Sequence, residues 1–231
     1  MIRLSRIIGL LFFAGAVTVL CVVGFWRPGL FLKEENIGHQ LGGDILADIS
    51  GNTLEALKVG LSKHESSPEW HYAECDIRET SDHQLIIFHD WDISAVPNSP
   101  ENRTALGEPV SDQAICDLTR DQLQQLTLKC GCKIPTLEEV LQVTVAAKPQ
   151  KPLLLEVKYL HSDEGRQQLL ELAKRYRDSS KVEIHFLAFI RNIKRSFPEP
   201  KRWLRQCAEA KFRVYQVYRP KTAENDLCKT W

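Results

Sequence analysis

The chain has 231 residues, a length that fits one domain with a substantial hydrophobic core. At 43% hydrophobic and 26% charged residues, its composition is that of a globular protein, which excludes a chain disordered throughout. The 30 basic residues balance the 30 acidic ones, so the charge gives no indication of a nucleic-acid partner.

Residues 7–26, IIGLLFFAGAVTVLCVVGFW, carry no charge. At about 1.5 Å per residue, a helix of this length spans about 30 Å, the thickness of the hydrocarbon core of a bilayer. We predict an uncleaved signal anchor that crosses the membrane once. A cleaved signal peptide is the main alternative, since Ala14-Gly15-Ala16 offers the small residues of a cleavage site. A buried core helix is the third, although such helices are rarely apolar on every side.

The charges beside this segment predict its orientation. Arg3 and Arg6 precede it, which favours a cytoplasmic position for the short N-terminus, residues 1–6. Residues 27–35 then form a linker, and residues 36–231 form a folded domain on the non-cytoplasmic side. The expected localisation is a single-pass membrane protein.

Strand-like and helix-like segments alternate through this domain, which predicts an α/β fold with a parallel sheet, either a barrel or a doubly wound sheet. The predicted strands are 36–40, 72–77, 84–89, 152–158, 182–189 and 212–219. The predicted helices are 53–64, 117–128, 136–147, 162–178 and 200–211. The sequence has neither G-x-G-x-x-G nor G-x-x-x-x-G-K-[ST], so no Gly-rich loop indicates nucleotide binding.

Polar residues mark where several of these helices begin. The first has Asn52 or Thr53 as its N-cap, and two later helices have Thr119 and Thr136. The polar stretch 96–112, which contains proline and glycine, is predicted to be a loop.

The seven cysteines are odd in number and form no zinc-type pair of C-x-x-C motifs. Cys130 and Cys132 form a C-x-C, which indicates a metal site only weakly. Loop cysteines, or a disulfide with another loop cysteine, are the favoured interpretation.

Ionisable residues interrupt two apolar strand segments with a period of two. Glu74 and Asp76 share one face of their strand, as do Glu156 and Lys158. The apolar run around Glu156 indicates a strand buried on both faces. Because unpartnered charges there would cost several kcal/mol, these residues are informative as a group.

Two histidines end strand-like segments, His39 in NIGHQ and His89 in LIIFHD. In a parallel barrel the active site lies at the carboxyl ends of the strands, so we expect them near the four residues above. Three carboxylates form a hard oxygen cage suited to Mg²⁺ or Ca²⁺, and two histidines can exchange protons near neutral pH. With a lysine for an anionic substrate, this set suits phosphoryl transfer.

The order of the motifs resembles the glycerophosphodiester phosphodiesterase family over about residues 37–190. The motifs are GHQ (38–40), GNTLEAL (51–57), ECDIRETSDHQLIIFHD (74–90), DLTRDQLQQL (117–126), IPTLEEVL (134–141) and LLLEVK (153–158). The resemblance implies a TIM-type (β/α) barrel over residues 36–231, with an insertion near 91–133. It implies hydrolysis of a glycerophosphodiester to glycerol 3-phosphate and an alcohol.

The resemblance also assigns roles to side chains. The three carboxylates Glu74, Asp76 and Glu156 match the ligands of the divalent cation, Mg²⁺ or Ca²⁺. His39 and His89 match the general acid/base pair, and Lys158 matches the lysine beside the substrate phosphate.

This chain departs from the family pattern at two positions near the expected site. Gln40 replaces the arginine that helps to hold phosphate, and its neutral amide makes a weaker hydrogen bond. Gly51 replaces the glutamate of E-N-T, which removes a carboxylate that Asp44 or Asp48 would have to replace. The barrel is also C-terminally short or incomplete, because the family's final W-T-V-N-like strand motif has no counterpart.

Two alternative functions follow from these features. The departures suggest a non-catalytic or vestigial barrel that acts as a binding module. The membrane anchor suggests a lysophospholipid-type phosphodiesterase, because it holds the domain close to lipid substrates. In each case the expected partner is a small molecule, and the sequence gives no oligomeric state.

Overall fold

The computed structural model describes residues 36–107 and 112–217. The predicted membrane-spanning segment, residues 7–26, lies outside these residues together with its flanks, residues 1–6 and 27–35. Among the helices that are described, we find none that combines the length and the apolar character needed to cross a bilayer.

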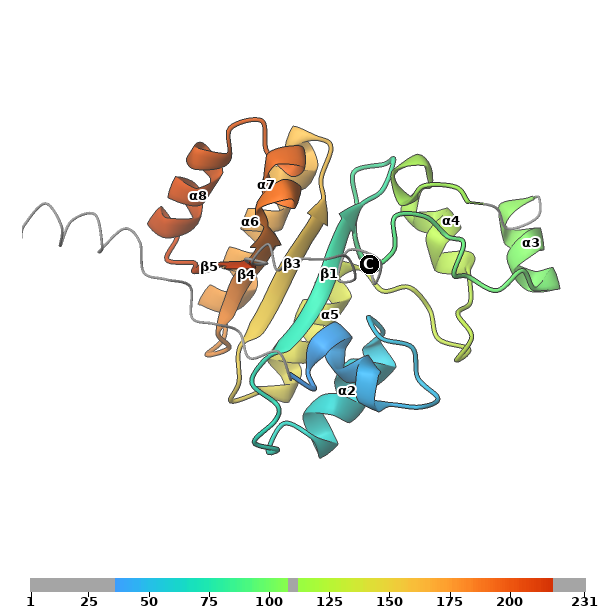
Figure 1. The fold of residues 1–231 in the computed structure, drawn as a ribbon, viewed down its shortest axis with the longest axis horizontal. Coiled ribbons are helices and arrows are strands. Elements are labelled where there is room, and N and C mark those ends of the chain that lie inside the picture. Colours follow the sequence, from blue (N-terminus) through green and yellow to red (C-terminus); the bar gives the residue numbers. More distant parts are fainter. Residues whose placement is uncertain (1–35, 108–111, 218–231) are drawn as a thin grey trace, which may run out of the picture. The chain divides into compact units, whose positions relative to one another are not determined.

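The described strands form one five-stranded sheet in the order β2-β1-β3-β4-β5 (Figure 1). Their bounds are β1 (Ala73–Glu79), β2 (Leu85–Ile87), β3 (Leu153–Tyr159), β4 (Ile184–Phe189) and β5 (Val214–Val217). β2 pairs with β1 in an antiparallel hairpin, and the remaining neighbours pair in parallel. The predicted α/β class is therefore confirmed, as is the hairpin without an intervening helix.

The described helices precede the first strand or connect later ones. They are α2 (Leu54–Lys63), α3 (Pro100–Leu106), α4 (Arg120–Gln125), α5 (Leu137–Ala147), α6 (Asp163–Asp178), α7 (Ile190–Ser196) and α8 (Pro200–Glu209). Two described segments are 3₁₀-helical: η1 (His39–Ile45), which is interrupted by a kink, and the single turn η2 (Ile115–Asp117). Thr53, Thr119 and Thr136 cap α2, α4 and α5 by accepting a backbone hydrogen bond, and the last two form capping boxes.

The strand predicted at residues 36–40 is wrong, because the chain turns there. Gln40 and Leu41 have φ angles of 47° and 61°, in the left-handed region that a strand cannot contain. The segment nevertheless runs beside β1, since the backbone N–H of Glu74 donates to the carbonyl of Gly38 at 2.9 Å. His39 is thus placed near β1 by a turn, not by a strand of its own.

Two short helices were not predicted. The stretch expected to be a loop, 96–112, contains α3, where Ser99 caps the helix and Pro100 begins it. α7 begins directly after β4, at Ile190, with no polar side chain capping it. Both helices have seven residues, too few for a clear apolar period.

Two hydrophobic clusters form the core. The larger one packs the sheet against the helices and includes Cys75 and Ile77, which point away from the ionisable face of β1. The smaller one lies beneath the insertion, where Ile86 and Phe88 pack in one cluster with residues such as Leu123.

Figure 1 shows α3 and α4 together beyond the β1–β2 edge, on the side away from α8. Within this insertion-side region Cys130 and Cys132 are disulfide-bonded to each other.

Candidate active site

The parallel pairing of β1 and β3 brings the predicted carboxylates together. Asp76 lies opposite Glu156 in the strand register, and Glu74 is two residues earlier on the same face of β1. One oxygen from each of these three carboxylates lies within 4.8 Å of the others. All three residues are buried, with exposed fractions of 0%, 0% and 3%.

Lys158 joins two of these carboxylates. Its Nζ lies 2.9 Å from Asp76 Oδ1 and 2.7 Å from Glu156 Oε1, in ion pairs that are almost fully buried. Glu74 acts on this ammonium group electrostatically as well, so three carboxylates share one lysine.

Neighbouring turns supply hydrogen bonds to the carboxylates. The Asn52 side chain donates to Asp76 Oδ2 at 2.7 Å and accepts from the Asp76 backbone N–H at 3.2 Å. The backbone N–H of Gln40 donates to Glu74 Oε2 at 3.0 Å. The second oxygen, Oε1 of Glu74, is buried and receives no hydrogen bond from the residues that the structure describes.

The charge imbalance shifts the pKa values of the carboxyls in different directions. Burial, reinforced by Asp76 and Glu156, raises the pKa of Glu74 well above its usual range. Burial also raises the pKa of Glu156, even though Lys158 acts against it. Burial alone would raise the pKa of Asp76, but Lys158 and then His89 hold it below its ordinary value.

The two predicted histidines lie beside this cluster on different segments. His39, partly exposed at the start of η1, has its Nε2 3.8 Å from Glu74 Oε2. His89 follows β2, and its Nδ1 lies 2.8 Å from Asp90 Oδ1. Arg78 fixes the loop by donating to the His89 carbonyl from Nε at 3.2 Å and Nη2 at 2.7 Å. The contact with Asp90 fixes the orientation of the His89 ring.

The two departures from the family motifs are neighbours in space. A Cβ built on Gly51 would lie only 2.5 Å from Gln40 Oε1 and 2.8 Å from Gln40 Cβ. The Gln40 side chain therefore fills the space into which a side chain at position 51 would project. Of the two acids considered as replacements, Asp48 is exposed, and the side chain of Asp44 is outside what the structure describes.

Three residues that contact the site were not predicted to do so. They are Asn52, Arg78 and Asp90. Each had a signal in the motifs: Asn52 stands in GNT, and Asp90 completes the pair His-Asp. Arg78 had the period-two spacing after Asp76 that places it on the same strand face.

The donor set fits a hard divalent cation. Carboxylate oxygens are the ligands that Mg²⁺ and Ca²⁺ prefer. One Glu74 oxygen is buried without a donor among the described residues, and burial together with mutual repulsion raises the pKa values of Glu74 and Glu156. A bound cation would relieve both features. Glu74, Asp76 and Glu156 are the residues that would hold it.

Comparisons with known proteins identify the relatives of this chain. The model of the glycerophosphoryl diester phosphodiesterase family matches residues 47–196. No match was found among proteins of curated function.

Several solved structures whose names describe phosphodiesterases are also similar to this chain. One from Silicibacter pomeroyi DSS-3 is 18% identical, covers 76% of this chain and 64% of its own, and has a TM-score of 0.51. One from Agrobacterium tumefaciens C58 is 15% identical, covers 76% and 72%, and has a TM-score of 0.50. A phosphodiesterase from Oleispira antarctica in complex with sn-glycerol-3-phosphate is 16% identical, covers 77% and 72%, and has a TM-score of 0.48. At these identities the first two show a shared fold only.

Proposed function

Because this chain belongs to the glycerophosphoryl diester phosphodiesterase family, a family of phosphoric diester hydrolases, we propose that it hydrolyses glycerophosphodiesters to glycerol 3-phosphate and an alcohol. The observation that carries the proposal is the convergence of three buried carboxylates and Lys158 where β1 and β3 pair. A divalent cation, Mg²⁺ or Ca²⁺, is proposed as the cofactor. When bound, it would neutralise negative charge on the phosphate.

The remaining residues would bind the substrate and move protons. Lys158 supplies a buried positive charge for the phosphate, and Gln40, whose backbone N–H donates to Glu74, would offer it the neutral amide of its side chain. His39 and His89 form the proposed acid/base pair, since both lie next to the carboxylate cluster. Asp90 holds the His89 ring through Nδ1 and so fixes its orientation toward the cluster.

The reaction balances with these groups. The oxygen of a water molecule forms a bond to phosphorus while the bond between phosphorus and the alcohol oxygen breaks. One histidine accepts the proton of the water, and the other donates a proton to the leaving alcohol. Lys158 stays protonated, because Asp76 and Glu156 overcome the effect of burial and raise its pKa.

The test is release of glycerol 3-phosphate from glycerophosphocholine with Mg²⁺ or Ca²⁺. We expect His39→Ala to lower the rate about 10²–10⁴-fold, the usual contribution of a general acid or base. His64→Ala is the matched control, since His64 follows α2 and lies outside the site. Full activity in folded His39→Ala protein, or equal loss in both variants, contradicts the proposal.

The contact between Gln40 and Gly51 favours a second candidate, a non-catalytic binding module. On that view the loss of the family's arginine and glutamate has removed activity, and restoring the pair should recover it. The variant to measure carries Gln40→Arg and Gly51→Glu together, because the two departures from the family motifs contact each other and are then reversed at once. Activity gained only in this double variant supports the module, and activity already present in the wild type excludes it.

We further propose that residues 7–26 anchor the domain to a membrane, with residues 36–231 on the non-cytoplasmic side as a TIM-type barrel domain. An anchored enzyme would meet lipid substrates, so a lysophospholipid should be compared with glycerophosphocholine at equal concentration. Protease added to intact cells should degrade the domain. Full protection of the domain would contradict this orientation.

A further inference from the structure

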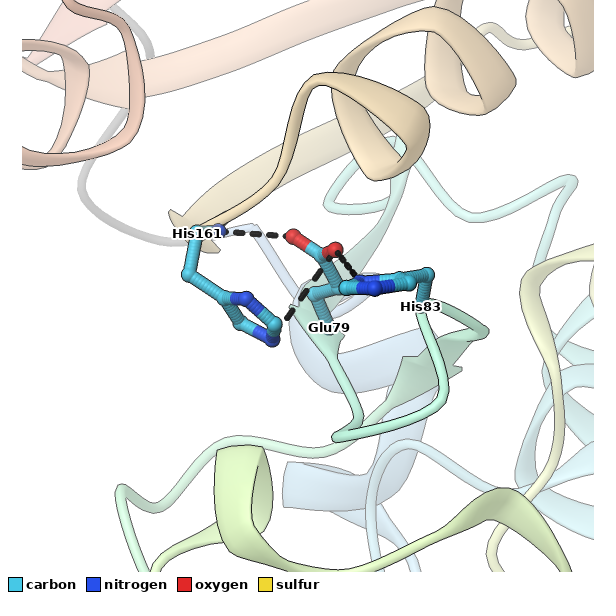
Figure 2. A group of neighbouring side chains, drawn as sticks. All are labelled: Glu79, His83 and His161. Atoms are coloured by element: carbon cyan, nitrogen blue, oxygen red, sulfur yellow. Dashed lines mark hydrogen bonds and ion pairs between the residues drawn. The ribbon is translucent and has the colours of Figure 1, made fainter.

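A second cluster of metal-ligating side chains lies outside the carboxylate site. Glu79 is the last residue of β1, His83 lies in the turn before β2, and His161 follows β3. Figure 2 shows both imidazole rings directed toward the carboxylate of Glu79. The ligand atoms Oε1, Nδ1 and Nε2 of these three residues lie within 4.8 Å of one another.

The Glu79 carboxylate is held firmly by donors from the start of α6. Its Oε2 accepts from the backbone N–H groups of His161 at 2.6 Å and Ser162 at 3.0 Å. Its Oε1 accepts from the Ser162 hydroxyl. A carboxylate has about four lone-pair positions, so these three donors leave one, on Oε1, which faces the imidazoles. Such hydrogen bonds from surrounding groups are what fixes a carboxylate ligand in metal sites.

The two imidazoles approach this remaining position from different segments. His83 Nδ1 lies 3.0 Å from Glu79 Oε1, and His161 Nε2 lies 3.8 Å from it. Both rings are accessible, with side-chain exposures of 46% and 25%, so solvent can supply a further ligand. His161 Nε2 is also 3.0 Å from the Thr80 carbonyl oxygen, a contact that it would give up to bind a cation.

An ion pair alone accounts poorly for this arrangement. Glu79 needs only one imidazolium partner, yet two rings face it with centroids 5.4 Å apart. Two imidazolium groups at that distance would repel each other. Two neutral rings beside one carboxylate can instead share a single cation.

We propose that Glu79, His83 and His161 form a site for a borderline transition metal of the Zn²⁺ type. Two imidazole nitrogens and one carboxylate oxygen are the ligand set that Zn²⁺ takes in open sites, with water in the fourth position. Binding requires the proton of His83 on Nε2 and that of His161 on Nδ1, so that each facing nitrogen offers a lone pair. The site joins the β1–β2 hairpin to the start of α6 and does not depend on the proposed hydrolysis.

The test is a Zn²⁺ titration of the full-length protein, monitored by isothermal titration calorimetry. Excess Mg²⁺ is present throughout, so that it occupies the three-carboxylate site. His83→Gly is the sharpest variant, because His83 has φ 60°, a conformation that glycine adopts without strain. We expect at least a tenfold weaker affinity in His83→Gly and in His161→Gln. Glu74→Gln, in the other cluster, and His64→Ala, a histidine elsewhere, should bind Zn²⁺ as the wild type does.

Two further measurements identify the ligands. Co²⁺ in place of Zn²⁺ should give visible bands without a sulfur-to-metal charge-transfer band, which excludes binding by the free cysteines. Zn²⁺ should raise the thermal midpoint of the wild type more than that of His83→Gly at the same concentration. Unchanged affinity in His83→Gly and His161→Gln, or loss of binding in Glu74→Gln alone, overturns the proposal.

Discussion

Two glutamates on one strand have buried carboxylates and opposite electrostatic behaviour. Glu74 and Glu79 both lie on β1, and their side chains are 1% and 0% exposed. The pKa of Glu74 is raised well above its usual range, first by burial and then by Asp76 and Glu156. Burial acts on Glu79 too, yet hydrogen bonds from Ser162 and His161 hold its pKa below the ordinary value.

The difference lies in the donors around each carboxylate. Among the residues that the structure describes, Glu74 receives one backbone hydrogen bond, from Gln40, and faces two other acids. Glu79 receives backbone and hydroxyl donors, and His83 Nδ1 lies 3.0 Å from its Oε1. Burial alone therefore does not decide the charge of a carboxylate; its neighbours do. A buried acid that its own fold leaves poorly compensated indicates a binding site, whereas a well-compensated acid contributes to stability even before any metal binds.

The largest expected effect tests Glu74. Glu74→Gln should lower the hydrolysis rate about 10²–10³-fold, the usual cost of removing one preorganised electrostatic group. The unfolding free energy should not fall, because the substitution removes one of three repelling carboxylates. The two measurements are a rate assay with Mg²⁺ and denaturant unfolding of the same protein. If Glu74→Gln lowered the unfolding free energy, the Glu74 carboxylate would contribute to stability as Glu79 does, and the proposed difference between the two glutamates would be wrong.

The opposite result is expected for Glu79. Glu79→Gln should lower the unfolding free energy by about 1–3 kcal/mol, because donors positioned for a charged carboxylate lose their acceptor. Denaturant unfolding in a metal chelator isolates this effect from any bound Zn²⁺. An unchanged midpoint in chelator would mean that these hydrogen bonds contribute little.

Gly165→Ala sharpens the comparison by crowding Glu79. A Cβ at this position in α6 would lie 2.4 Å from Glu79 Cδ. Overpacking usually costs about 1–3 kcal/mol, and alanine in a helix recovers about 1 kcal/mol relative to glycine. The net loss should be about 0–2 kcal/mol by denaturant unfolding. In Glu79→Ala protein the same substitution should stabilise the fold, and a loss there as well would locate the crowding elsewhere.

The smallest effect concerns a buried base. The pKa of His185 lies below its ordinary value of 6.5, chiefly because the side chain is buried and next because Arg213 is near. Arg177 lowers this pKa further, whereas Glu183 raises it. Its Nδ1 accepts the Arg213 backbone N–H at 3.4 Å, which requires the neutral ring. The unfolded chain therefore binds this proton more readily than the folded one. Stability contributed by the neutral ring is complete above about pH 6.5 and decreases as the pH falls below it.

His185→Gln should flatten this part of the stability curve. The measurement is the unfolding free energy at several values between pH 5 and pH 7.5, compared with wild type. Equal slopes in the two proteins would assign the pH dependence to other groups.

The sequence was most informative where chemistry and strand period coincide. Charged residues two apart in apolar segments predicted that Glu74, Asp76, Glu156 and Lys158 would meet, because parallel strands align their faces. Threonine caps predicted three helix starts, since a hydroxyl acceptor is a local requirement. These signals depend on neighbours in the chain and need no tertiary contacts.

Other features depend on contacts that no local pattern contains. His161 meets Glu79 from 82 residues away, so nothing near either residue indicates their cluster. Asn52 was considered only as a cap, but its left-handed φ of 59° turns its amide toward Asp76. The strand expected at residues 36–40 was wrong for a similar reason: Gln40 adopts a backbone conformation that its residue type seldom takes.

The alignment of β1 with β3 has a consequence for how the protein acquires function. Asp76 stands opposite Glu156 because apolar residues on both strands fix one pairing. A slip of one residue would turn Glu156 and Lys158 to the opposite side of the sheet and expose leucines in their place. Misassembled molecules would therefore lack the pocket entirely instead of holding a weakened one, so a refolded sample should divide into fully competent and inert fractions.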